Sequence, residues 1–254
     1  MSSDAAAPAS SPAAAAAVPA PAPASSPAAA AAAPALATAA SSAAVARLLV
    51  PPTAVAARAR EVTATHASEA LLGHSERSWA LAAELGRRES VAVDAELLYV
   101  AALLHDLGLV PPFDAHAVDF EQAGGAVARV FAAGAGWSEP RQRRLAEVVE
   151  RHMWPSVDVA LDAEAHLLER ATSLDVSGTG GADWDDAFVA SLVAAVPRLG
   201  FAAEFSRAIG DQAARKPEGH AGRTVRGGMP ERIAANPLDR HAPGMLSPRP
   251  RFTP

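Results

Sequence analysis

The chain has 254 residues, a formal net charge of −6 and no cysteine. The lack of cysteine excludes disulfides and thiolate metal sites, which leaves His, Asp and Glu as possible metal ligands. Oxygen and nitrogen ligands of this kind suit zinc, iron or manganese. The negative charge argues against a nucleic-acid surface, which usually shows as a basic face or stripe.

The first 45 residues are mostly Ala, Pro and Ser, and we expect them to form a disordered tail. So few large apolar side chains cannot offset the entropy of ordering the chain, and the prolines as far as Pro34 are expected to prevent a continuous helix. A signal peptide is not expected, because the start of the chain is not basic. No run of about 18 uninterrupted apolar residues occurs, so we expect a cytoplasmic protein that does not span a membrane.

From about Ala44 onward, Ala, Leu and Val recur at spacings of three and four residues, which predicts an all-α domain over residues 46–215. Thr53, Asp94, Ser138 and Asp162 are expected to cap helices, and Gly108 and Gly178 to end them. The predicted helices run over residues 53–70, 72–85, 94–108, 117–133, 138–152, 162–175, 183–196 and 200–214. Residues 216–254 are rich in Gly, Pro and Arg, so we expect an extended or disordered segment draped over the domain.

The central predicted helix, ELLYVAALLHDLGL at residues 96–109, is apolar on every side until its last turn. A helix without a polar stripe is expected to be buried in a larger helical protein. It carries His105 and Asp106 into the interior, where each needs a partner. A metal ion satisfies both at once; the alternative is a hydrogen-bonded core histidine beside an Asp that binds backbone amides.

Candidate ligands come from three predicted helices: His74, His105, Asp106 and Asp175. Together they suffice to hold one divalent ion with positions open for water. The segments around them, HSERSWALAAELG, ELLYVAALLHDLGL and ATSLDVSG, resemble the HD-domain metalloenzymes, in which a His, a His-Asp pair and a distant Asp hold the metal. The segments FEQAGGAVARVF and FAAEFSRAIGDQAARKPEG are similar to the cyanamide-hydratase-like branch. The resemblance covers about residues 70–220.

This resemblance implies an HD-domain helical bundle and a bound divalent ion, with zinc expected and iron or manganese as alternatives. HD enzymes with two metals use further histidines, for which His116 and His152 are the candidates. One of these often stands where this chain has Glu121, so a second metal is not expected. Asp106, Glu121 and His152 are the candidate catalytic residues. We expect Arg77 and Phe120 to contact the substrate, and His66, His166, His220 and His241 to be ordinary surface or core residues.

Three function classes follow from such a site. A divalent ion with an open position supplies hydroxide at neutral pH, which suits hydration or hydrolysis of a small, weakly charged molecule. For the cyanamide-hydratase-like branch, the resemblance implies a nitrile that yields a urea. Phosphohydrolase action on a nucleotide or phosphomonoester and a noncatalytic regulatory role are the alternatives.

The distribution of cations favours the first class. No Lys or Arg occurs from Glu89 through Ala128, whereas phosphoryl transfer needs positive groups aimed at the phosphate oxygens. Only Arg77, Arg151 and Arg170 lie near the other candidate ligands in sequence. The expected partners are therefore a small-molecule substrate and possible further copies of the chain, with neither nucleic acid nor membrane.

Overall fold

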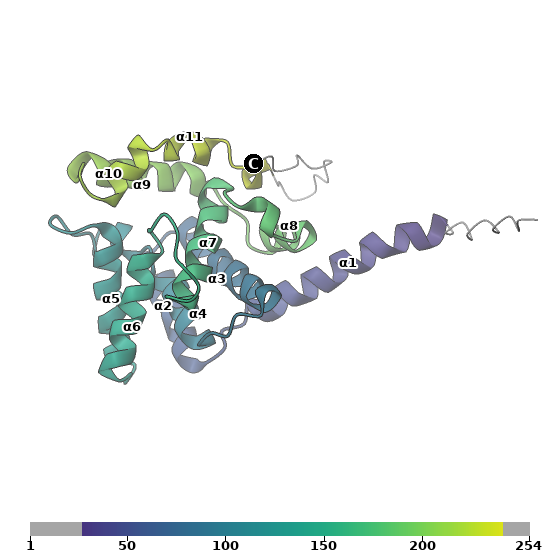
Figure 1. Ribbon diagram of the computed structural model, residues 1–254, viewed down its shortest axis with the longest axis horizontal. Coiled ribbons are helices and arrows are strands. Elements are labelled where there is room, and N and C mark those ends of the chain that lie inside the picture. Colours follow the sequence, from purple (N-terminus) through teal and green to yellow (C-terminus); the bar gives the residue numbers. More distant parts are fainter. Residues whose placement is uncertain (1–26, 241–254) are drawn as a thin grey trace, which may run out of the picture.

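The computed structural model describes residues 27–240, with side chains from residue 37 onward, as helices without any strand in that range (Figure 1). The expectations for residues 1–26 and 241–254 lie outside the described residues. The helices are α1 Pro27–Leu48, α2 Ala54–His66, α3 Glu69–Glu89, α4 Ala95–Leu104, α5 Phe120–Gly134, α6 Glu139–Arg151, α7 Ala163–Ser177, α8 Asp186–Ala195, α9 Phe201–Arg215, α10 His220–Arg226 and α11 Met229–Ala234. Short 3₁₀ turns cover η1 Leu107–Leu109, η2 Gly181–Asp183 and η3 Pro237–Arg240. Within the described part, no helix combines the length and apolar character needed to cross a bilayer.

Helix α4 forms the centre of the fold, as its sequence predicts. Each residue from Leu97 to Leu104 is at most 3% exposed. The helix packs against α2, α3 and α6, with further contacts to α5 and α7. An apolar surface enclosed on all sides stabilises the bundle, and it fixes the position of the residues that follow Leu104.

The predicted caps set the ends of several helices. Thr53, Asp94 and Asp162 each accept a hydrogen bond from the backbone N–H three residues ahead, at 3.1, 3.0 and 2.8 Å. Each bond satisfies an amide that has no partner inside the helix. Gly178 ends α7 with φ of 73°, a left-handed conformation that glycine adopts without a steric cost.

Two glycines allow α5 to approach the turn that follows α4. A Cβ atom at Gly108 would lie 1.9 Å from the carbonyl oxygen of Phe120, and one at Gly124 would lie 2.7 Å from that of His105. Both positions therefore require glycine for the close contact between α5 and η1. Gly108 was expected to stop the central helix, but α4 already ends at Leu104, and Gly108 lies in η1 where it packs on α5.

Helix α1 begins nearer the N-terminus than the sequence indicates. Prolines were expected to prevent a continuous helix as far as Pro34, yet α1 runs from Pro27 to Leu48 and projects from one side of the bundle (Figure 1). Alanine-rich sequence has high helix propensity, and packing on α8 adds tertiary stabilisation. Val45 is 1% exposed, and the Trp79 Nε1–H donates to the Leu48 carbonyl oxygen at 2.7 Å. The end of α1 is thus part of the packed domain.

The expectation of extended or disordered structure beyond Lys216 is wrong for the described residues. Helices α10 and α11 and turn η3 form there, and α10 and α11 pack on α9 while α11 also contacts α7 (Figure 1). Ile233 and Leu238 are buried, and the Asn236 side chain donates to the Asp175 carbonyl oxygen at 2.9 Å. Helices this short are marginal alone, so tertiary contacts rather than local propensity form them. The segment thus packs on the domain as helices, through α7 and α9.

Candidate metal centre

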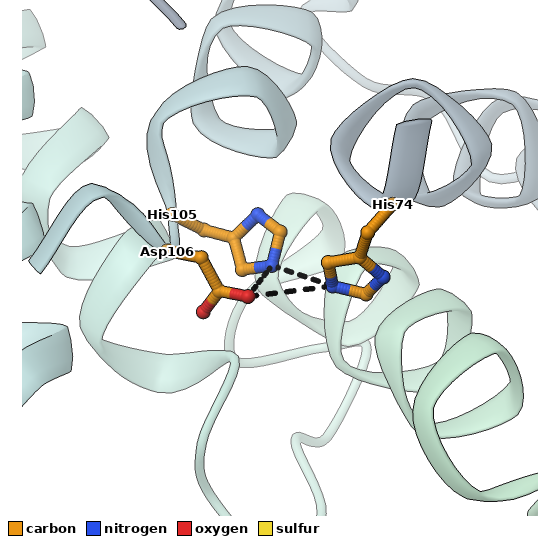
Figure 2. Close-up of side chains that lie close together, drawn as sticks. All are labelled: His74, His105 and Asp106. Atoms are coloured by element: carbon orange, nitrogen blue, oxygen red, sulfur yellow. Dashed lines mark hydrogen bonds and ion pairs between the residues drawn. The ribbon is translucent and has the colours of Figure 1, made fainter. Parts of the chain in front are cut away.

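The fold brings His74 of α3 against the His105-Asp106 pair that follows α4 (Figure 2). The Nε2 atoms of the two imidazoles lie 3.1 Å apart. Asp106 Oδ2 lies 3.3 Å from Nε2 of His105 and 3.5 Å from Nε2 of His74. All three residues are at most 2% exposed, so the cluster is an interior site.

Hydrogen bonds on the outer side of the rings fix which nitrogens face inward. His105 Nδ1 lies 2.8 Å from the Ala102 carbonyl oxygen, and His74 Nδ1 lies 2.7 Å from Asp175 Oδ2. Both partners are acceptors, so each Nδ1 carries the hydrogen and each Nε2 directs its lone pair into the cluster. The His74 ring is also stacked on Phe201, with centroids 4.3 Å apart.

This donor set fits a divalent metal ion. Neither oxygen of Asp106 meets the geometry of a hydrogen bond with a described residue, although both are buried. Two lone pairs and a carboxylate oxygen at such close range repel one another unless a cation lies between them. Ligands at about 2.0 to 2.1 Å from a tetrahedral ion are about 3.3 Å apart, which agrees with the spacing of this cluster.

The pKa values show the same need for positive charge. Burial would raise the pKa of Asp106, but His105 and the other imidazoles hold it well below its usual range. Burial lowers the pKa of His105, but the adjacent Asp106 outweighs this effect and raises it. Both shifts reflect the attraction between the Asp106 carboxylate and positive charge beside it, which a bound metal ion would supply. Burial lowers the pKa of His74 despite its contact with Asp175, so that ring is neutral, as a metal ligand must be.

His152 adjoins the cluster at the end of α6, in agreement with its predicted place in the site. Its Nε2 lies 3.7 Å from Asp106 Oδ1, on the side of the carboxylate away from His74. Its Nδ1 donates to the Val149 carbonyl oxygen, which directs the Nε2 lone pair inward. Burial and the neighbouring His105 lower its pKa to about 3, so the ring is neutral. The other candidate, His116, is exposed in the loop before α5.

Asp175 lies behind His74, outside the cluster of three. Its carboxylate accepts two hydrogen bonds from Arg77, both at 2.8 Å, besides the one from His74. Burial would raise its pKa, but Arg77, His74 and Arg198 hold it well below its usual range. The predicted role of Asp175 as a fourth ligand stays a prediction, and this geometry makes it the residue that orients His74.

Three other predicted site residues lie away from the cavity that the cluster faces. Arg77 was expected to contact substrate, but its buried guanidinium is occupied by Asp175 and two carbonyl oxygens. Phe120 packs edge-on against His152, with centroids 6.0 Å apart. Glu121 was expected to move protons near the metal, but its carboxylate contacts His220. The packing of these side chains therefore supports the site from behind.

The pairing of Glu121 with His220 is a feature that the sequence did not indicate, since His220 was expected to be an ordinary residue. His220 begins α10, and its backbone N–H donates to Asp119 at 3.1 Å. Burial raises the pKa of Glu121, although His220 partly offsets the effect. The two residues are far apart in sequence, and no local pattern predicts their contact. His241 lies outside the described residues.

A cavity of about 240 Å³ opens onto the cluster and His152. One face of α7 lines it with Glu169, Thr172, Ser173 and Val176, at the spacing of residues that share a helix face. The remaining wall comes from the segment after α6, from α9 and from the C-terminal segment, through Met153, Trp154, Pro155, Phe205, Ile209, Thr224, Gly227, Met229 and Arg232. These α7 residues were not predicted from the sequence, although their mutual spacing of three and four residues, on the helix that carries Asp175, indicates a shared face.

The geometry defines a metal-dependent helical enzyme, and comparison with known proteins agrees. Residues 71–176 match the family model of the HD domain, a range that contains His74, His105, Asp106 and Asp175. Residues 71–176 thus form an HD domain, and the comparisons support membership of the cyanamide-hydratase-like branch of that superfamily. The chain is similar to the cyanamide hydratases DDI2 and DDI3 of Saccharomyces cerevisiae, each 28% identical over 180 residues, which cover 68% of this chain and 80% of each relative. It is thus a metal-dependent hydrolase or hydro-lyase.

Proposed function

We propose that this enzyme adds water to a small, weakly charged nitrile of the cyanamide type and forms the corresponding urea. The observation that carries the proposal is the charge of the cavity that faces the metal cluster. Its one lining cation among the described residues is Arg232, which is exposed and donates to the Gly227 carbonyl oxygen, whereas the acidic Glu169 is buried in the wall. Such a wall suits a neutral substrate better than a phosphate. The names of the two yeast relatives support the same substrate class.

The arginines that lie near the candidate ligands in sequence form ion pairs outside the cavity. Arg77 binds Asp175, Arg151 lies 2.5 Å from Asp162, and Arg170 contacts Glu89 and Asp183 at 2.8 and 2.6 Å. Phosphohydrolase action remains the alternative class, because HD domains commonly have it and a metal ion can itself bind a monophosphate.

The donor set of two imidazoles and one carboxylate leads us to propose zinc as the metal, with His74, His105 and Asp106 as its holders. When bound, such an ion lowers the pKa of water toward about 7 and polarises the electrophile. Asp106 supplies a carboxylate whose Oδ1 is turned to His152, so these two residues lie where they can pass on the proton that water loses, although His152, with a pKa of about 3, does not retain it. The hydrogen bond from His152 Nδ1 to Val149 keeps its Nε2 available for that proton.

The test is a comparison of two activities on one metal-loaded sample. We expect cyanamide to be converted to urea, with little phosphate released from nucleoside monophosphates. The His105→Ala variant should lose this activity together with its metal. Efficient phosphate release without detectable urea, abolished in that variant, would promote the phosphohydrolase alternative instead.

A further inference from the structure

The cavity beside the metal cluster is large for cyanamide itself. Its volume of about 240 Å³ is more than ten times the roughly 10–15 Å³ that a cavity needs to hold one water molecule. Cyanamide consists of one amino group on one nitrile and would leave most of this space unfilled. The volume lies just below the range of about 300 to 1,000 Å³ that is usual for small-molecule sites, so a substrate larger than cyanamide fits beside the cluster.

One wall of the cavity is suited to a hydrocarbon group. Phe205 and Ile209 lie one turn apart on α9, and both are buried. Val176 of α7 and Met229 of α11 complete this apolar surface. An apolar group placed here leaves water, and roughly 25 cal/mol is gained for each Å² of its surface that is buried.

Glu169 places a hydrogen-bond acceptor in the same cavity. Its side chain is 9% exposed, and the Ser173 hydroxyl donates to its Oε1 at 2.9 Å. The Thr172 hydroxyl donates to the Glu169 backbone carbonyl instead. Burial raises the pKa of this carboxyl, since its charge is incompletely compensated by the protein. A ligand N–H in the cavity compensates part of the negative charge of Glu169, whereas an anionic ligand is repelled by it.

We propose that the preferred substrate is an N-substituted cyanamide with an apolar substituent, held by Glu169 through its N–H and by the apolar wall through its hydrocarbon group. This inference rests on the proposed function and specifies the substrate of the same site. In the reaction, the oxygen of water bonds to the nitrile carbon and both water protons end on the nitrile nitrogen. The product is an N-substituted urea, and no group leaves.

The experiment uses benzylcyanamide as the larger substrate and cyanamide as the smaller one. We expect kcat/KM for benzylcyanamide to exceed that for cyanamide by at least about tenfold. Benzylurea, which does not react, serves as a binding probe by calorimetry on the metal-loaded protein. Benzyl phosphate carries the same ring with an anionic group and should bind at least about tenfold more weakly than benzylurea.

Two variants test the two walls. Met229→Trp fills the apolar side and should lower kcat/KM for benzylcyanamide by at least about tenfold, a larger loss than the one it causes for cyanamide. Glu169→Gln keeps the shape but removes the charge, and it should weaken benzylurea binding by about fivefold or more. Glu218→Gln is the matched control, since that side chain is 91% exposed, and should change neither quantity.

The outcomes separate this inference from the proposed function. Cyanamide hydration without benzylurea binding, or binding that neither cavity variant weakens, would overturn the inference and leave the proposed function standing. Benzylurea binding that both variants weaken, without hydration of either nitrile, would support the ligand class and overturn the proposed function.

Discussion

Asp175 Oδ2 lies 2.7 Å from Nδ1 of His74, the ring nitrogen that faces away from His105 and Asp106. The carboxylate is itself fixed by two hydrogen bonds from Arg77. The contact sets the tautomer of His74, so that its Nε2 lone pair points at the position a metal would take. Asp175 therefore affects metal binding through the orientation of His74, whether or not Asp175 itself contacts the ion.

Replacement of Asp175 distinguishes an orienting residue from a ligand. We expect Asp175→Asn to weaken metal binding by about 10- to 100-fold while a full equivalent still binds at saturating metal. Titration with a chelator that competes for zinc measures the affinity. If the variant cannot reach one equivalent at any metal concentration, Asp175 is a ligand, as the sequence predicts.

Replacement of His105 removes a proposed direct ligand. His105→Ala should retain little metal by elemental analysis, because one of three converging donors is lost. His116→Ala provides the control, since that side chain is exposed in the loop before α5 and should leave the metal content unchanged. Full metal content in His105→Ala would show that the cluster does not bind the ion as proposed.

The contact between α5 and the His105 turn predicts an effect on stability. Gly124→Ala places a Cβ atom 2.7 Å from the His105 carbonyl oxygen, so the helix must shift, and we expect a loss of about 1 to 3 kcal/mol in the free energy of unfolding. Gly210→Ala in α9 meets nothing within 4 Å and should stabilise the protein by up to about 1 kcal/mol through helix propensity. Urea denaturation measures the free energy of unfolding of both variants. Equal changes in the two variants would contradict the close packing at Gly124.

The buried carboxylate of Asp162 predicts a pH dependence. Burial would raise its pKa, but Arg144 and Arg151 outweigh this effect, and the pKa lies below its ordinary value of 3.8. Its stabilising effect is therefore present above the unfolded pKa and is lost as the pH falls through the folded one. Asp162→Asn should cost about 1 to 2 kcal/mol at pH 7. The gap in melting temperature between this variant and the native chain should narrow as the pH falls below 3.8. A gap that does not change with pH would show that the charge of Asp162 does not stabilise the fold.

The central features of the fold could be predicted because they depend on local chemistry. The apolar run before His105 required burial, and Asp94 and Asp162 offered side chains suited to helix caps. The cluster of His74, His105 and Asp106 could be predicted for a similar reason, because a buried His-Asp pair needs a partner.

The remainder depends on contacts between distant parts of the chain. Helices α10 and α11 are too short to be indicated by periodicity and exist because they pack on α7 and α9. The contact of Glu121 with His220 joins two elements that no local pattern connects. The position of Arg77 was misjudged for the same reason, because sequence separation from His74 cannot show that its guanidinium turns toward Asp175.

The cavity wall formed by α10 and α11 has a consequence for the order in which the protein is made. His74, His105 and Asp106 leave the ribosome long before Met229, which belongs to the wall. A chain that has emerged only as far as α9 therefore contains the residues proposed to bind the ion but lacks one side of the pocket beside them. Because domains generally fold as units, the pocket can be completed only after these last helices have been synthesised.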